Sequence, residues 1–340
     1  MHAPDSPNGN DGAMSPRPLI VDTDGGVDDA AALWYLLTTP SVDVVAITVV
    51  HGNVATEIAV ANVCRVLHEA GRPDIPVAVG VNDPVGPAPV LNAPVGIHGL
   101  DGMGNTNRPP APFGPVATPA LELLSALTNA RPGEIALITL GPLSNIGALI
   151  NAEPTWASTV DEIIVMGGTV NRCGNALPAA EANIAHDPVA AQIVGGAAWV
   201  KPPVLVGLDV THVATMTDAE FALLAERRTP AAVSLDEPLR FYRPMGSTFC
   251  DPGECPCHDL LAAMVAVHPG IVTCLTLPLG VDTGGGVAWG ATVADRRVPF
   301  FERRGPGSAQ ASAPGMSPWR IALDVDVALF RAEVRRLFGG

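Results

Sequence analysis

The chain has 340 residues, of which 48% are hydrophobic and 16% charged, so it can bury a sizeable core. Its 34 acidic and 19 basic residues give a net charge of −15, which argues against nucleic acid or an anionic membrane as a partner, because both need a basic face. No segment reaches the roughly 18 apolar residues that span a bilayer, and no secretory signal is visible. We therefore expect a cytoplasmic protein.

The first 17 residues differ in composition from the rest of the chain. Residues 1–17 are rich in Pro, Gly, Asn and Asp, and we expect a flexible leader there. Residues 18–340 contain no clean linker, so we expect them to fold as one domain.

Apolar runs and helical spacings alternate along the chain. The runs predict strands at 19–23, 42–50, 76–79, 135–140, 163–166 and 204–208, and the spacings predict helices at 30–37, 55–70, 121–127, 143–150 and 189–194. Residues 273–326 predict extra strands around a Gly/Ser/Pro-rich loop at 304–317, and residues 327–338 predict a last amphipathic helix. Continuous apolar strands separated by helices indicate a single α/β domain: a mostly parallel open sheet flanked by helices, with a Rossmann-like core.

Two long segments break this alternation. Residues 80–117 are rich in Gly, Pro and Asn, which is typical of a long functional loop. Residues 229–257 are predicted to be partly helical and then turn-rich.

Four carboxylates crowd the turn between the first predicted strand and the first helix: Asp22, Asp24, Asp28 and Asp29. In a parallel sheet this turn lies at the carboxyl end of a strand, where ligands bind. Carboxylates this close repel one another unless they are protonated or share a cation such as Ca²⁺ or Mg²⁺, which prefer oxygen ligands.

Helix geometry divides the work among these carboxylates. Neighbouring helical residues point about 100° apart. We therefore expect one of Asp28 and Asp29 to bind the metal and the other to bind a substrate hydroxyl. Asp24 can touch both the metal and a bound water, and Asp22 can support it from the strand. A favourable interaction with the helix dipole would explain Asp28 and Asp29 alone, but not Asp22 and Asp24.

The segment from Asp22 to Ala30 resembles the DTDPGxDDA signature of the inosine–uridine-preferring nucleoside hydrolase family, with Gly25 where proline is usual. Further motifs follow in the family's order, and the resemblance runs from about residue 19 to residue 338. These motifs are His51-Gly52-Asn53, HGLDGMG at 98–104, LGPLSNI at 140–146, MGG at 166–168, Gly174-Asn175, AEAN at 180–183, Asp187-Pro188, LDVTH at 208–212 and His258-Asp259.

The resemblance implies that residues 18–340 form a nucleoside hydrolase domain. Such an enzyme hydrolyses the N-glycosidic bond of ribonucleosides to ribose and free base with one Ca²⁺, in nucleoside salvage or catabolism, as a homodimer or homotetramer. Asp24 is the implied base that deprotonates a calcium-bound water, and His258 the group that protonates the departing base. The implied metal ligands are Asp24, Asp29, the carbonyl of Leu140 and Asp259, and the implied substrate-binding residues are Asp28, Asn53, Met166, Asn175, Glu181 and Asn183.

Departures from the family pattern bear on the substrate. Ala182 replaces a phenylalanine and loosens the wall near the ribose 5′ side, and Leu260 replaces a proline. His258 stands where the purine-specific branch has a tryptophan, and none of the five tryptophans adjoins a motif, which favours a pyrimidine-tolerant enzyme. Phe241 and Tyr242 are candidates for a base-facing helix, and we add Tyr242 to the predicted substrate-binding set.

Two other functions stay open at this point. One is a hydrolase of the same fold that acts on a modified riboside, such as a nucleoside antibiotic or nicotinamide riboside. The other is a calcium-dependent nucleoside-binding protein without turnover, although Asp24, Asn183 and His258 are all retained.

Cysteines and histidines near the motifs have less specific interpretations. Cys250, Cys255 and Cys257 precede His258 and can form a structural zinc site, a disulfide or labile thiol pair, or unpaired thiols. The remaining motif histidines are predicted to line the pocket (His51 and His98) or to serve structure (His186 and His212).

Overall fold

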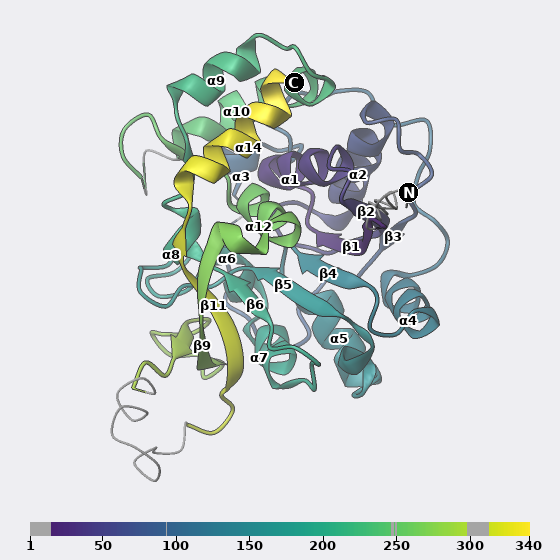
Figure 1. The fold of residues 1–340 in the computed structure, drawn as a ribbon. Helices are drawn as coiled ribbons and strands as arrows, with labels where there is room; N and C mark the ends of the chain where they lie inside the picture. Colours follow the sequence, from purple (N-terminus) through teal and green to yellow (C-terminus); the bar gives the residue numbers. More distant parts are fainter. Residues whose placement is uncertain (1–14, 93, 246–247, 249, 298–312) are drawn as a thin grey trace, which may run out of the picture.

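The computed structural model describes residues 15–92, 94–245, 248, 250–297 and 313–340 (Figure 1). Its centre is a nine-stranded sheet with the order β10-β9-β11-β6-β5-β4-β1-β2-β3, and β7 and β8 form a separate two-stranded sheet. The strands are β1 (Arg17–Thr23), β2 (Val42–Val49), β3 (Val77–Val79), β4 (Ala136–Thr139), β5 (Glu162–Met166), β6 (Val204–Val206), β7 (Thr215–Met216), β8 (Cys255–Pro256), β9 (Val272–Val281), β10 (Thr292–Ala294) and β11 (Ser317–Val325).

Helices connect most of these strands and pack on the sheet. They are α1 (Val27–Leu37), α2 (Thr56–Glu69), α3 (Val95–His98), α4 (Ala120–Ala130), α5 (Ser144–Ala152), α6 (Ala182–His186), α7 (Pro188–Gly196), α8 (Leu208–Thr211), α9 (Asp218–Ala225), α10 (Pro230–Tyr242), α12 (His258–Val267) and α14 (Val327–Gly339).

The sheet is parallel from β3 through β11, and only β9 runs antiparallel, to both β11 and β10. This confirms the predicted α/β class and the extra C-terminal strands. The chain winds outward from β1 in both directions, through β2 and β3 on one side and through β4, β5 and β6 on the other. The point between β1 and β4 is therefore the topological switch point, where open α/β sheets bind ligands beyond the strand ends.

Two hydrophobic cores cover the two faces of the sheet. Along β1, Leu19 and Val21 pack into one core and Ile20 into the other, because side chains alternate across a strand. Figure 1 shows α1, α2 and α12 on one face and α5 and α7 on the other. Burial on both faces explains why β1 is a continuous apolar run in the sequence.

The predicted elements agree with the observed ones to within a few residues. β1 begins at Arg17, whose N–H donates to the Ser41 carbonyl at 2.9 Å, so the last residue of the predicted leader already belongs to the sheet. The predicted loop at 80–117 contains the short helix α3. Residues 1–14 of the leader, most of the loop at 304–317, and residues 246, 247 and 249 lie outside the described residues.

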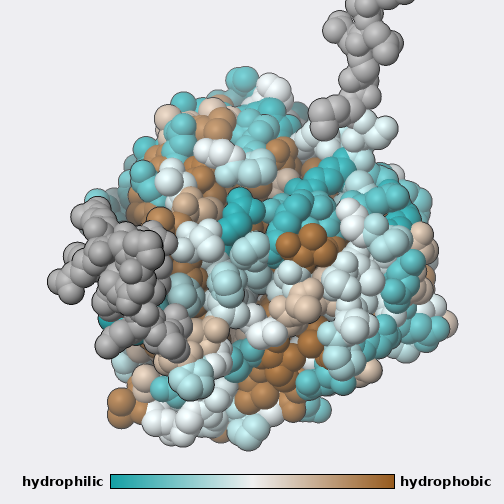
Figure 2. Space-filling view, turned by 60° about the horizontal axis from the view of Figure 1, so that its bottom comes forward, coloured by the Kyte–Doolittle hydropathy of each residue, from teal (hydrophilic) through white to brown (hydrophobic). Residues whose placement is uncertain are grey.

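The described surface is mixed in polarity. Figure 2 shows one face, on which apolar residues form several separate groups among polar ones. Within the described residues, no helix is both long and apolar enough to cross a membrane.

The acidic turn between β1 and α1 needs glycine at position 25. Gly25 has φ +66°, and a Cβ added there would lie 2.7 Å from the Ala59 Cα atom. The Asn62 side chain holds the turn by donating to the Gly25 carbonyl at 3.0 Å. Because proline fixes φ near about −65°, the proline of the family signature does not fit this backbone conformation.

We expect Gly25→Ala to lower the free energy of unfolding by about 2–4 kcal/mol, from the left-handed backbone and the clash with α2 together. Gly133→Ala is the matched control, because Gly133 has φ +75° but no atom within 4 Å of the added Cβ. Gly133→Ala should lower the free energy of unfolding only by the backbone strain, about 1 kcal/mol. Urea unfolding in the presence of chelator measures both, and equal losses would contradict the proposed clash.

Candidate functional site

A cavity of about 320 Å³ lies at the carboxyl ends of the central strands. All the predicted site residues line it except Asp24 and Asp29, which are buried and do not line it. The lining residues are Asp28, Asn53, Leu91, Asn92, Pro94, Ile97, His98, Leu140, Met166, Asn175, Ala176, Glu181, Ala182, Asn183, His186, Tyr242, His258 and Asp259.

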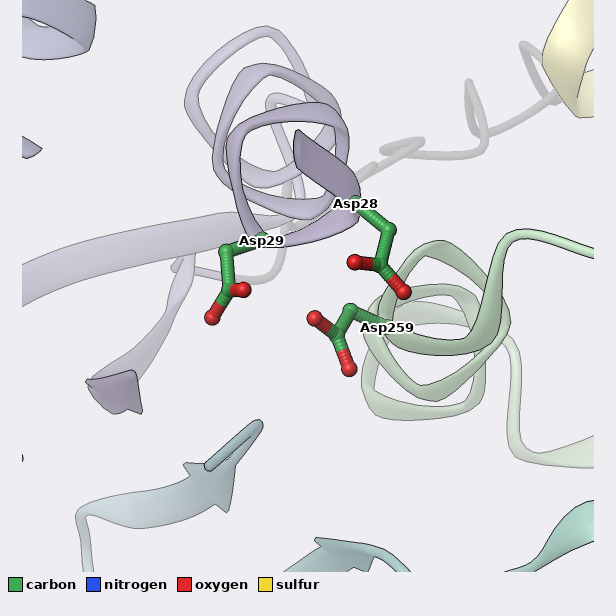
Figure 3. Close-up of side chains that lie close together, drawn as sticks. All are labelled: Asp28, Asp29 and Asp259. Carbon is green, nitrogen blue, oxygen red and sulfur yellow. The ribbon is translucent and has the colours of Figure 1, made fainter. Parts of the chain in front are cut away.

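Three buried carboxylates meet beside this cavity. Asp28 and Asp29 come from the first turn of α1, and Asp259 comes from the first turn of α12. One oxygen from each lies within 4.8 Å of the others, and Figure 3 shows the three side chains turned toward the space they share. Within the described part of the chain, no other group of three or more carboxylate, imidazole or thiol side chains meets this distance.

Burial and mutual repulsion make these carboxylates hard to ionise. Burial raises the pKa of Asp259 well above its usual range, and repulsion from Asp28, Asp29 and Asp24 raises it further. The pKa of Asp24 is also raised well above its usual range, by burial and then by Asp29. Because a bound cation would remove this repulsion, the site is suited to a divalent metal ion.

Hydrogen bonds fix the orientation of Asp24 and Asp29, the two predicted site residues that do not line the cavity. Asn53 donates to both oxygens of Asp24, through its backbone N–H at 2.7 Å and its side-chain amide at 2.9 Å. Asp29 accepts from the Thr23 hydroxyl and from the Gly26 N–H at 2.8 Å. Gly52 makes this approach possible, since a Cβ there would lie 2.0 Å from an Asp24 oxygen.

Asp22 lies outside the cluster of Asp28, Asp29 and Asp259. Its Oδ1 accepts hydrogen bonds from the Thr48 hydroxyl on β2 and from the Asn145 amide at the start of α5, at 2.7 Å. Burial raises the pKa of Asp22 to about 7, although these two hydrogen bonds lower it. Asp22 therefore connects β1 to β2 and to α5, next to the acidic turn.

The wall opposite α1 is built around the N-terminus of α6. Glu181 caps this helix by accepting from the N–H groups of Asn183 and Ile184, and it also accepts from Gly168 at 2.9 Å. Burial raises the pKa of Glu181 to about 7, and these amides lower it. The Asn175 side chain accepts from the backbone N–H of Ala182 at 2.9 Å, so the two segments support each other.

Asn183 ties this wall to the ends of β4 and β5. Its amide donates to the carbonyl of Leu140 at 2.7 Å and to the carbonyl of Met166 at 3.2 Å. The predicted carbonyl ligand and the predicted ribose-facing methionine are thereby held side by side.

His258 and Tyr242 close the site from α12 and α10. His258 Nδ1 lies 2.8 Å from the hydroxyl of Thr211, a buried residue of α8. Burial lowers the pKa of His258 to about 3, and repulsion from His212 and His98 contributes. The Tyr242 hydroxyl donates to Asp28 at 3.1 Å. Phe241, the other predicted aromatic, is not among the described residues that line the cavity.

Several residues that line or support this cavity were not predicted from the sequence. Thr211 was visible only as a member of the LDVTH motif, and Leu91, Asn92, Pro94 and Ile97 only as part of a long loop. His98 lines the cavity as predicted, but His51 does not, and His186, expected to serve structure, does line it. His51 instead contacts Ser144, with Nε2 at 2.8 Å from the Ser144 hydroxyl. Because that hydroxyl donates its own proton to Asp187, it accepts the hydrogen bond from His51.

The cysteines do not form a metal site in the described part of the chain. Cys255 and Cys257 are buried, and Cys250 is half-buried, with its thiol 3.5 Å from the His212 carbonyl. All three are free thiols, and burial raises the pKa of each. The structure therefore favours unpaired thiols over the zinc and disulfide alternatives.

The known proteins that this chain resembles in sequence and in structure are all named as nucleosidases or nucleoside hydrolases. A sequence model described as "Inosine-uridine preferring nucleoside hydrolase" matches residues 19–332. The "Probable uridine nucleosidase 2" of Arabidopsis thaliana is 33% identical over 310 residues, which cover 91% of this chain and 94% of the relative. The "Inosine-uridine preferring nucleoside hydrolase" of Leishmania major is 34% identical and covers 84% of this chain and 89% of its own. A solved plant nucleoside hydrolase superposes with a TM-score of 0.85 at 31% identity, covering 96% of this chain and 100% of its own.

Asp259→Asn should raise the thermal midpoint of the ion-free protein by about 2 °C or more, because it removes one of the mutually repelling carboxylates. It should also abolish the stabilisation that an added divalent cation gives. Asp161→Asn is the matched control, since Asp161 pairs with Arg17 at 2.8 Å and Lys201 at 2.6 Å, and its loss should lower the midpoint. Thermal scans at pH 8 in chelator measure both variants, and a lower midpoint for Asp259→Asn would contradict the repulsion.

Proposed function

The chain belongs to the inosine-uridine preferring nucleoside hydrolase family, which makes it an N-glycosidase, and we propose that it hydrolyses ribonucleosides, uridine foremost, to ribose and free base. The observation that carries this proposal is the meeting of Asp28, Asp29 and Asp259 beside a cavity with amide and imidazole walls. The printed names of the Arabidopsis and Leishmania relatives support uridine as the first substrate to try.

The metal proposed for this site is Ca²⁺, held by Asp24, Asp29, Asp259 and the carbonyl of Leu140. All these donors are oxygen atoms, which hard divalent cations prefer. The raised pKa values of Asp24 and Asp259 support the assignment, because a cation offsets the repulsion that raises them. When bound, such an ion would polarise a water molecule and lower its pKa in part, so that a neighbouring base can remove the proton near neutral pH.

Asp24 is the proposed general base. Its carboxylate is oriented by both donors of Asn53, so its free lone pairs face a fixed direction. A carboxylate with a raised pKa accepts a proton more readily than an ordinary one, which suits the removal of a proton from water at neutral pH.

Asp28 is the proposed ligand of a ribose hydroxyl. It lines the cavity, whereas Asp29, the next residue in α1, does not, and this difference supports separate roles for the two. Cleavage of a ribosyl C–N bond builds positive charge on the sugar, and negative side chains fixed nearby stabilise that charge.

His258 is the proposed donor of a proton to the departing base. It lines the cavity, and because Nδ1 faces the Thr211 hydroxyl, Nε2 is the atom left for the substrate. Burial favours the neutral imidazole, so the Nε2-protonated tautomer is the form that donates.

The base end of the cavity is proposed to take a pyrimidine. Leu91, Pro94 and Ile97 supply aliphatic contacts, and the aromatic rings that line the described cavity are His98, His186, Tyr242 and His258, without tryptophan or phenylalanine. The cytoplasmic location, the place in nucleoside salvage and the homodimer or homotetramer stay predictions.

The test is release of reducing sugar from uridine, cytidine, inosine and adenosine, each with Ca²⁺ and with chelator. We expect release from uridine with Ca²⁺ and its loss in chelator. Binding without release would support a nucleoside-binding protein, and release only from an unusual riboside would support the modified-riboside alternative. Either result would contradict the proposal.

The same assay needs a catalytic variant and a matched control. Asp24→Asn should lower kcat by more than about 10³-fold while the fold is kept, because the base is lost. Asp43→Asn, which changes an exposed aspartate at the start of β2, should leave kcat unchanged.

His258→Ala should depend on the leaving group. For uridine we expect kcat/KM to fall by about 10²–10⁴-fold, and for 4-nitrophenyl riboside, whose leaving group needs no proton, by less than about tenfold. His268→Ala, at the exposed end of the same helix, is the control and should affect neither. Equal losses on both substrates would remove His258 as the acid.

A further inference from the structure

We infer that Asp187 is a positioning residue for the base end of the cavity, because it anchors the loop that carries Leu91 and Asn92; the inference rests on the proposed function. Asp187 is completely buried between α6 and α7, and it does not line the cavity itself. None of the roles proposed above for the hydrolysis uses its carboxylate.

The carboxylate of Asp187 accepts hydrogen bonds from three separate segments. Its Oδ1 accepts from the backbone N–H of Ala190 in α7 at 2.9 Å. Its Oδ2 accepts from the Ser144 hydroxyl at the start of α5 and from the backbone N–H of Val85 in the loop, each at 2.7 Å. Hydrogen bonds to a carboxylate are stronger than those between neutral groups, because the acceptor is charged. Asp187 therefore joins the loop firmly to two helices.

The loop lies against these two helices along the short stretch that follows β3. Figure 1 shows α5 and α7 on the same face of the sheet. The backbone N–H of Val81 donates to the Asn145 side chain in α5 at 2.9 Å. The backbone of Gly86 passes so close to α7 that an added Cβ would lie 2.8 Å from the Val189 side chain. The anchor at Val85 lies between these two contacts.

Beyond Gly86 the loop has little other support. Among the described residues, 86–92 form no hydrogen bond with another element, yet Leu91 and Asn92 line the cavity. The position of these two residues thus depends on the ends of the stretch, and the bond between Val85 and Asp187 fixes the nearer end. Because Leu91 belongs to the proposed base end, loss of this bond should weaken binding of the base more than binding of the ribose.

Two variants remove this bond in different ways. Asp187→Ala removes the acceptor from all three donors, whereas Val85→Pro removes only the donor in the loop and serves if Asp187→Ala does not fold. In either variant we expect KM for uridine to rise roughly tenfold, while kcat stays within about threefold. A purely structural role would instead lower the fraction of active enzyme, and so lower kcat at an unchanged KM.

An inhibitor without a base separates the two ends of the cavity. The probe is 1,4-dideoxy-1,4-imino-D-ribitol, which presents the sugar ring alone. Its inhibition constant should change by less than about twofold in Val85→Pro, because the ribose-facing residues keep their places. Hydrogen exchange of the backbone amides in residues 81–92, followed by mass spectrometry, should be faster in Val85→Pro than in the unmodified enzyme.

The controls change neighbouring groups and leave the anchor in place. Asp83→Asn removes an exposed charge from the same loop, and Ser144→Ala removes the other donor to Asp187 Oδ2. Both should keep KM for uridine within about twofold and leave the exchange of residues 81–92 unchanged.

An unchanged KM in Val85→Pro, or an equal rise in KM and in the inhibition constant of the iminosugar, would overturn the inference. No hydrolysis of uridine by the unmodified enzyme would contradict the proposed function. In that case the exchange measurement still decides about the anchor, since equal exchange in Val85→Pro and in the unmodified protein would overturn it separately.

Discussion

Concentration of buried negative charge at one point is the constraint on which the rest of this structure depends. Carboxylates cost free energy when they are withdrawn from water, and more when they face each other. The fold offsets part of that cost, because α1 and α12 both begin at the cluster and direct their backbone N–H groups toward it. Burial raises the pKa of Asp28, and hydrogen bonds from Tyr242 and from the backbone of His258 and Asp259 offset part of that rise.

The topology of the sheet explains where this charge lies. Asp24 follows β1 and Leu140 follows β4, and these two strands are neighbours at the switch point of the sheet. The connections leave that point in opposite directions, so the space beyond the strand ends stays open to a ligand. Asp22 stabilises the carboxyl end of β1, because its hydrogen bonds connect β1 to β2 and to α5.

The sequence predicted the local features of this site well, and the distant ones less directly. The acidic turn and the parallel sheet follow from residues close together in the chain. The approach of Asp259 to Asp29 came only from the family resemblance, because spacing in the sequence does not show which helices pack together. Thr211 and His186 were missed as contacts of the site, since their roles depend on a hydrogen bond and a cavity wall that exist only in the folded chain.

One consequence concerns the time at which this site can form. Asp29 and Asp259 are separated by 230 positions, yet their carboxylates belong to one cluster. A ribosome has therefore completed most of the chain before the last of these side chains emerges. Until then α1 lacks the α12 surface against which it packs, and the nascent protein lacks Asp259, the third carboxylate of the cluster. Binding of the proposed ion would therefore come at the end of synthesis, when it would join the first and last thirds of the polypeptide.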